Sequence, residues 1–170
     1  VIVVAPQLGG NNYGIRVTCP GESEAAYAIK GIWQVDEEGL ARFNKRDAEV
    51  LVHEFCHSFA NRVIDANIRE LREPAEALYA HVAFDMAMQS YGRPDIMLYE
   101  SLVRALVIRY LREYSTSEYA EMIQNIEMNL NGFLWMRELV ALFEAFESGR
   151  AAYPDLESFG QGCVGLRRHG

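Results

Sequence analysis

The pattern of hydrophobic and polar positions divides the chain near residue 44. Before that point, short apolar runs alternate with turn-forming residues such as Gly9-Gly10-Asn11-Asn12 and Pro20-Gly21, which is typical of β-strands joined by turns. The pattern predicts strands over residues 1–5, 13–18 and 25–35, and a turn at residues 36–39.

After Asn44 the apolar residues recur at helical spacing. Pro74 and Pro94 suit the first turns of helices, and the polar run 115–118 offers a helix cap. The pattern predicts helices near residues 45–63, 73–90, 94–114, 116–128 and 131–148.

A small sheet that precedes a helical body is an α+β arrangement. The length of 170 residues suits one domain, and a hydrophobic content of 50% is enough to form a core. We therefore expect a single domain over residues 1–170. It would comprise a β-rich part at 1–43, a helical part at 44–150 and an irregular tail from 151.

The net charge of −8 argues against a nucleic-acid-binding protein, because phosphate contacts require clustered basic residues and none are present. No apolar run reaches the roughly 18–20 residues of a membrane span. The first residue is Val1 rather than methionine, which favours a trimmed or processed chain.

Three cysteines are too few for a disulfide framework. Cys19 and Cys163 would pair only if the two ends of the chain meet. Cys56 is interpreted as a small buried thiol rather than a metal ligand, because it lies off the histidine face of its helix.

The sequence His53-Glu54-Phe55-Cys56-His57 is the strongest chemical signal in the chain. Two histidines four residues apart project from one face of a helix, as two ligands of a tetrahedral zinc ion do. Glu54 is turned about 100° away, where it flanks the metal and can accept a proton from an activated water. The motif therefore predicts a zinc site with Glu54 as the general base.

The rest of this helix predicts how it packs. Five apolar side chains fall on the face opposite the histidines, and we expect that face to be buried while the histidines line a cleft. These side chains are Leu51, Val52, Phe55, Phe59 and Val63.

A catalytic zinc usually has three protein ligands, and the sequence favours Glu100 as the third. It lies in a segment, residues 96–108, that is apolar nearly all round the helix, where a carboxylate needs a cation or a paired charge. Arg104 lies four residues later and would pair with it. A Glu100–Arg104 ion pair without any metal is the alternative.

Other residues compete for the position of third ligand. Glu76 follows His57 at a spacing that thermolysin-like enzymes resemble, but we place it in the first turn of a helix, where acidic residues are favoured anyway. His81 suits a core or rim position. Asp65 lies close to the predicted helix end, and His169 is expected in the exposed tail.

These stretches resemble the gluzincin branch of the peptidase MA-like metallopeptidases, and more narrowly a bacterial family, domain of unknown function 4932. The similarity rests on residues 53–61 and 99–105, with Gly9 to Gly14 as a further match. It implies a zincin-like fold, a zinc ion, Glu100 as third ligand, Asn61 beside the site, and a protein exported from a bacterial cell. It implies no particular substrate.

The hypothesis that follows is a zinc metallopeptidase that cleaves a peptide or protein substrate. The strand at residues 25–35 could pair with an extended peptide if it is an edge strand. The oxyanion-stabilising group stays open among His81, Tyr91, Tyr99, Tyr110 and Tyr114. Two alternatives remain: a zincin-fold module that keeps the metal without turnover, and a metal-free helical interaction domain.

Overall fold

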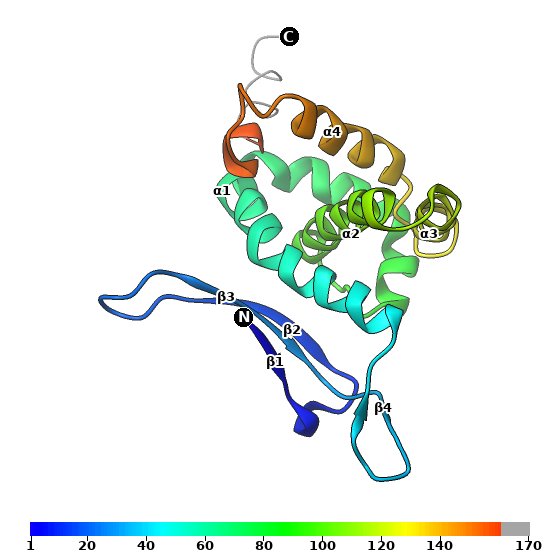
Figure 1. Cartoon of the computed structure of the whole chain (residues 1–170). Helices are drawn as coiled ribbons and strands as arrows, with labels where there is room; N and C mark the ends of the chain where they lie inside the picture. The colour runs from blue at the N-terminus through cyan, green and yellow to red at the C-terminus, as the bar shows by residue number, and fades with distance from the viewer. Residues whose placement is uncertain (161–170) are drawn as a thin grey trace. The chain divides into compact units, whose positions relative to one another are not determined.

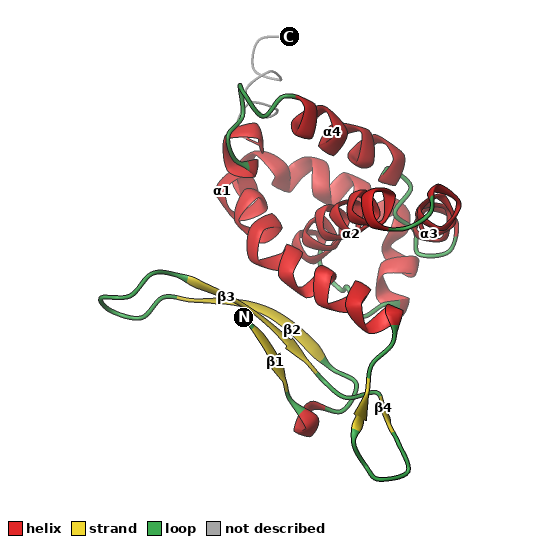
Figure 2. Cartoon of the chain, viewed as in Figure 1, coloured by secondary structure: helices red, strands yellow, loops and turns green. Residues whose placement is uncertain are grey.

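The computed structural model describes residues 1–160, which form an α+β fold with a small N-terminal sheet and a mainly helical remainder (Figures 1 and 2). The chain divides into two compact units. The boundary between them in the sequence falls between Phe59 and Ala60, within one continuous helix. The strands are β1 (Ile2–Val4), β2 (Asn12–Val17), β3 (Ala25–Lys30), β4 (Gln34–Val35) and β5 (Ala41–Arg42). The helices are α1 (Lys45–Met88), α2 (Pro94–Tyr114), α3 (Ser117–Asn129) and α4 (Met136–Ser148), with a short 3₁₀ turn at Pro6–Leu8. Residues 156–160 are also helical, so the prediction of an irregular tail from residue 151 is wrong for this stretch.

The first unit contains a three-stranded sheet in the order β1-β3-β2. Strand β3 pairs in parallel with β1 and antiparallel with β2, so that Ala28 lies opposite both Ile2 and Gly14. The condition that the strand at residues 25–35 is an edge strand is therefore not met by β3. β3 is the central strand, and among the described residues β1 and β2 form the edges.

The predicted strand at residues 25–35 is also too long. β3 ends at Lys30, and β4 belongs to a separate two-stranded hairpin with β5. Gly31 explains the interruption, because a Cβ at this position would lie 2.1 Å from the carbonyl oxygen of Gly9. The close approach of two backbones ends the regular strand here.

Helix α1 runs without a break from Lys45 to Met88, whereas the sequence predicted two helices separated at residues 64–72. That segment contains neither glycine nor proline, so nothing in it terminates a helix. Pro74 lies inside the helix rather than in a first turn. It cannot donate to the carbonyl of Glu70, a cost that tertiary packing outweighs here.

The second unit packs α2 against α3 and α4 around a core of large apolar side chains. Two boundary predictions are confirmed. Pro94 begins α2, and the Thr116 hydroxyl accepts a hydrogen bond from the Tyr119 N–H at the start of α3. The last helix begins at residue 136 rather than 131, because Gly132 adopts a φ of +78° in the preceding turn. The fully buried core side chains include Met86, Met97, Ile108, Phe133, Met136 and Val140.

Within residues 1–160, none of the helices has the length and apolar character that a membrane crossing requires.

Candidate metal site

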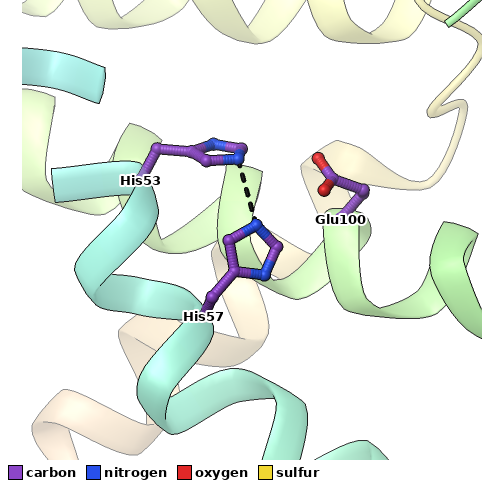
Figure 3. A group of neighbouring side chains, drawn as sticks. All are labelled: His53, His57 and Glu100. Atoms are coloured by element: carbon purple, nitrogen blue, oxygen red, sulfur yellow. Dashed lines mark hydrogen bonds between the residues drawn. The ribbon is translucent and has the colours of Figure 1, made fainter. Parts of the chain in front are cut away.

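His53 and His57 project from the same side of α1, one helical turn apart (Figure 3). Their Nε2 atoms lie 3.2 Å apart, and their rings meet edge to face with 4.9 Å between centroids. Two nitrogens that each bind a tetrahedral zinc ion at 2.0–2.1 Å lie about 3.3 Å apart. The spacing of the two imidazoles therefore fits one shared metal ion.

Glu100 places a carboxylate oxygen near the two imidazoles. One possible ligand atom from each of His53, His57 and Glu100 lies within 4.8 Å of the others. Figure 3 shows the Glu100 carboxylate near the two imidazole rings. Among residues 1–160, these three residues form the group of histidine, cysteine or acidic side chains whose spacing suits a metal ion. Glu100 comes from α2, and only 7% of its surface is exposed. The structure thus brings together the three residues that the sequence selected as ligands.

Glu54 lies on the same helix but outside this group of ligand atoms. It is 9% exposed, and its backbone carbonyl lies against strand β2. A Cβ at Gly14 would lie 1.8 Å from the Glu54 carbonyl oxygen and 3.1 Å from the Cβ of His57. Only glycine permits this approach, so Gly14 lets β2 lie directly against the histidine helix.

A second contact holds β2 at the same helix. The Arg16 Nε donates a hydrogen bond to the carbonyl of Ser58, and the guanidinium lies 4.8 Å from the ring centroid of Phe59. Sequence reasoning missed the roles of Gly14 and Arg16. A glycine inside a strand pattern was the available signal, since such glycines mark places where another backbone comes close.

The apolar face of the helix differs from the prediction. Of the five apolar residues, Val63 is buried as predicted, whereas Phe59 is 50% exposed and Leu51, Val52 and Phe55 are only partly buried. In residues 51–60 the buried positions are instead Glu54, Ser58 and Ala60. Strand β2 contacts this helix through Gly14, at the backbone of Glu54 and the Cβ of His57.

Arg104 pairs mainly with a residue that sequence reasoning did not identify. Its Nη1 donates to both carboxylate oxygens of Glu127 on α3, at 2.8 and 2.7 Å. Its Nη2 donates to the Tyr91 hydroxyl at 2.9 Å, and its Nε lies 3.5 Å from a Glu100 oxygen. Asn131 also donates to Glu127. The predicted Glu100–Arg104 contact is present, as one side of a larger cluster.

The charges of this cluster determine how its members titrate. Burial by itself would lower the pKa of Arg104, but the Glu127 carboxylate, Tyr91 and Glu100 together raise it. Burial raises the pKa of the Tyr91 hydroxyl, against the opposing effect of the Arg104 charge. The cluster therefore contains a permanent cation and a neutral phenol at neutral pH.

The competing ligand candidates lie elsewhere. Glu76 and His81 are exposed, and Glu76 lies within the long α1 rather than in a first turn. Asp65 is exposed and accepts a hydrogen bond from the Tyr99 hydroxyl. That bond and burial raise the pKa of Tyr99 to about 12, with burial the larger cause. Within residues 1–160, none of these candidates belongs to the group formed by His53, His57 and Glu100.

Other predicted residues are placed as follows. Asn61 is partly buried on α1, one turn after His57. Cys56 is outside the metal group, and burial raises the pKa of its thiol to about 12, as suits a packed rather than a ligating thiol. Cys19 is exposed, and its suggested partner Cys163 lies outside the described residues, as does His169.

Comparison with known proteins gives a family but no characterised relative. Searches among curated proteins and among solved structures found no match. One family model matches residues 1–164, which is nearly the whole chain. The chain belongs to the family described as Domain of unknown function (DUF4932).

Proposed function

We propose that this chain is a zinc-dependent hydrolase that cleaves peptide bonds, with His53, His57 and Glu100 as the metal ligands. The observation that carries the proposal is the convergence of two imidazole nitrogens and one carboxylate oxygen within 4.8 Å. Two histidines and a glutamate, with a fourth position left for water or substrate, are a ligand set of catalytic zinc sites. The histidine–glutamate helix resembles that of the zincin metallopeptidases in this respect.

The charge of the surroundings supports a cation at this position. Arg104 is the cation of a buried cluster that contains two carboxylates, Glu100 and Glu127. With both histidines neutral, the cluster has a net charge of −1 in a region where an uncompensated charge is costly. A divalent cation held by Glu100 and the two histidines would reverse the sign of that charge and provide Glu100 with a strong electrostatic partner.

The chemistry divides between the metal and Glu54. Zinc, when bound, acts as a Lewis acid that makes water more acidic and polarises a substrate carbonyl. The Glu54 carboxylate takes the proton of the attacking water and then delivers it to the leaving amine. His53 and His57 would bind the metal in their neutral forms, because a protonated imidazole has no free lone pair for a metal ion.

Strand β2 is the candidate surface for an extended substrate. It is an edge strand of the sheet, and Gly14 places it against Glu54 and His57. An extended peptide can add to such an edge through backbone hydrogen bonds, with its side chains alternating between the two faces. The central strand β3 cannot take this role, although the sequence suggested it for residues 25–35, because β3 has strands on both sides.

No residue is assigned to oxyanion stabilisation. Tyr91 and Tyr99 both hydrogen-bond to other side chains, to Arg104 and Asp65 respectively. Tyr110 and Tyr114 stack on each other with 4.8 Å between ring centroids.

The experiment that tests the proposal separates metal binding from turnover. Purified protein should contain about one zinc per chain by elemental analysis, and His53→Ala together with His57→Ala should remove it. Glu54→Gln should keep the zinc and lower the hydrolysis of a peptide library by about 10²–10⁴-fold. Glu49→Gln, on the same helix, serves as the control and should change neither.

The outcomes distinguish the alternatives. Zinc in the wild-type chain without any turnover would favour a zincin-fold binding or structural module over an enzyme. Full zinc occupancy in the double histidine variant would overturn the site itself. Unchanged turnover in Glu54→Gln would overturn the mechanism.

A further inference from the structure

The second unit contains an apolar pocket that the proposed hydrolase does not use. It has a volume of about 610 Å³ and lies among α1, α2 and α4, with Gly160 at its border. None of His53, His57 and Glu100 lines it. Pockets of about 300–1,000 Å³ are the size that accommodates small organic ligands.

Its walls are mainly aliphatic. Leu71 from α1, Leu98 and Leu102 from α2, and Leu139 from α4 contribute side chains, and Trp135 adds an aromatic surface. Such a surface favours the alkyl or aryl part of a ligand, because removing apolar area from water is favourable.

The polar side chains of the lining are already engaged with the protein. The Trp135 Nε1–H donates to the Ser101 hydroxyl at 3.0 Å, and that hydroxyl donates to the Met97 carbonyl at 2.7 Å. Asn67 donates to the Val63 carbonyl at 2.8 Å. Trp135 and Ser101 thereby use their only side-chain donors, so neither can donate to an anionic ligand.

The charged side chains of the lining are of one sign. Glu70 on α1 and Glu138 on α4 both border the pocket, and no lysine, arginine or histidine does so within the part of the chain that the structure describes. Both glutamates are exposed, as befits charges at a rim rather than in a core. An apolar interior with an acidic rim complements a ligand that has an apolar body and a positive charge.

We propose that this pocket binds a small amphiphile with one cationic amine and an alkyl or aryl body. The body would lie against the leucines and Trp135, and the amine would lie near Glu138. The proposal is independent of the metal site, since it uses none of the residues of that site.

The test uses three probes with the same alkyl chain: decylammonium, decanol and decanoate, each below its aggregation concentration. Titration calorimetry on the full chain should give an affinity order of decylammonium above decanol and decanol above decanoate. A fluorescence change on adding decylammonium should persist in Trp33→Phe and disappear in Trp135→Phe, because only Trp135 lines the pocket.

Charge reversal at the rim tests the recognition of the amine. Glu138→Lys should weaken decylammonium binding by about tenfold while it leaves decanol unchanged. Glu118→Lys is the matched control, because Glu118 is likewise an exposed acid in the first turn of a helix, α3, and does not line this pocket. It should alter the binding of decylammonium by less than about twofold.

Several results would overturn the proposal. Decanoate binding as tightly as decylammonium would exclude selection by charge, and an equal loss in Glu118→Lys would indicate a general field effect. A fluorescence change that is unaffected in Trp135→Phe would place the probe elsewhere. If Leu142→Arg at the pocket rim converts a dimer into a monomer in sedimentation, the pocket is covered by a second copy of the chain, and the small-molecule proposal is wrong.

Discussion

Each unit of this protein buries a cluster of charged side chains, and the two clusters differ in how their charges balance. In the first unit, the Lys30 Nζ lies 2.9 Å from an Asp47 oxygen, with exposed fractions of 0% and 3% for the two residues. The same ammonium donates to the Gly31 carbonyl and lies 3.8 Å from the ring centroid of Trp33. Asp47 also accepts from the Asn44 N–H. The charges of this pair cancel.

The cluster of the second unit contains Arg104 with two carboxylates, Glu127 and Glu100. Its own charges sum to −1, although Arg104 donates hydrogen bonds to Glu127 and Tyr91 and Asn131 donates to Glu127. The comparison teaches that burial of charge alone does not identify a functional site. A neutral buried pair serves the fold, whereas an excess of one sign points to a ligand of the other sign.

Asp47→Asn should have the largest effect on stability. It leaves the ammonium of Lys30 buried without a counter-charge, so the free energy of unfolding should fall by about 3–5 kcal/mol. Urea denaturation measures this. Replacing both partners, as in Lys30→Met with Asp47→Leu, should recover most of the loss, because no charge then remains buried. Glu157→Gln in the exposed Arg62–Glu157 pair should cost less than about 0.5 kcal/mol.

The same pair predicts an acid dependence. Burial alone would raise the pKa of the Asp47 carboxyl, but the hydrogen bonds from Lys30 and Asn44 and the charge of Lys30 hold it below its ordinary value of 3.8. A lowered pKa means that the stabilisation is fully present above 3.8 and is lost as the pH falls through the folded-state value. The wild-type chain should therefore lose more stability than Asp47→Asn below pH 3.8. Equal losses in both chains would contradict the role of Asp47.

Glu100→Ala should act on metal binding rather than on the fold. Removing one of three ligands should weaken zinc binding by about 100-fold or more, which corresponds to about 2.7 kcal/mol. Arg104 keeps the bidentate contact with Glu127, so the stability of the metal-free protein should change little. This revises the expectation that Glu100 is the main partner of Arg104.

Glu76→Ala is the matched control for this test, since Glu76 was the competing ligand and is exposed on α1. It should leave zinc affinity unchanged in a competition assay with a chelator. If Glu76→Ala loses the metal while Glu100→Ala retains it, the assignment of the third ligand is wrong.

Glu127→Gln has the smallest expected effect and tests the difference in charge between the two buried clusters. It removes one negative charge and leaves Arg104 with Glu100, so that the cluster becomes neutral like the Lys30–Asp47 pair. Zinc affinity should fall by about 10–100-fold, because Arg104 then competes with the metal for Glu100. Glu121→Gln, on an exposed part of the same helix, is the control. Unchanged zinc affinity in Glu127→Gln would show that the charge balance of the cluster is irrelevant to the metal.

The sequence correctly predicted those features of the fold that depend on the local pattern of residues. The α+β class, the start of α2 at Pro94 and the cap at Thr116 follow from periodicity and helix-end chemistry, which neighbouring residues determine. The selection of Glu100 among many acidic residues rested on the cost of a carboxylate in an apolar helix, and the residue is indeed buried.

What the sequence did not predict depends on contacts between distant segments. Glu127 contacts Arg104 from another helix. The residue spacing within a single helix cannot predict such a pair. The position of β3 in the middle of the sheet follows from pairing with β1 and β2, which a strand's own residues do not specify. Tertiary packing also keeps α1 helical through Pro74, against the local preference to begin a helix there.

Gly14 has a consequence for how members of this family can be identified. A chain that keeps β2 in contact with the carbonyl of Glu54 must have glycine at this position, since any side chain would displace either the strand or the histidine helix. A combined sequence pattern is therefore more selective than the histidine–glutamate motif alone. It requires a glycine in the second strand and the motif after it, at the same sequence separation as between Gly14 and His53. A genome search with this combined pattern would retain chains that conserve the strand–helix geometry and reject chance occurrences of the five-residue motif.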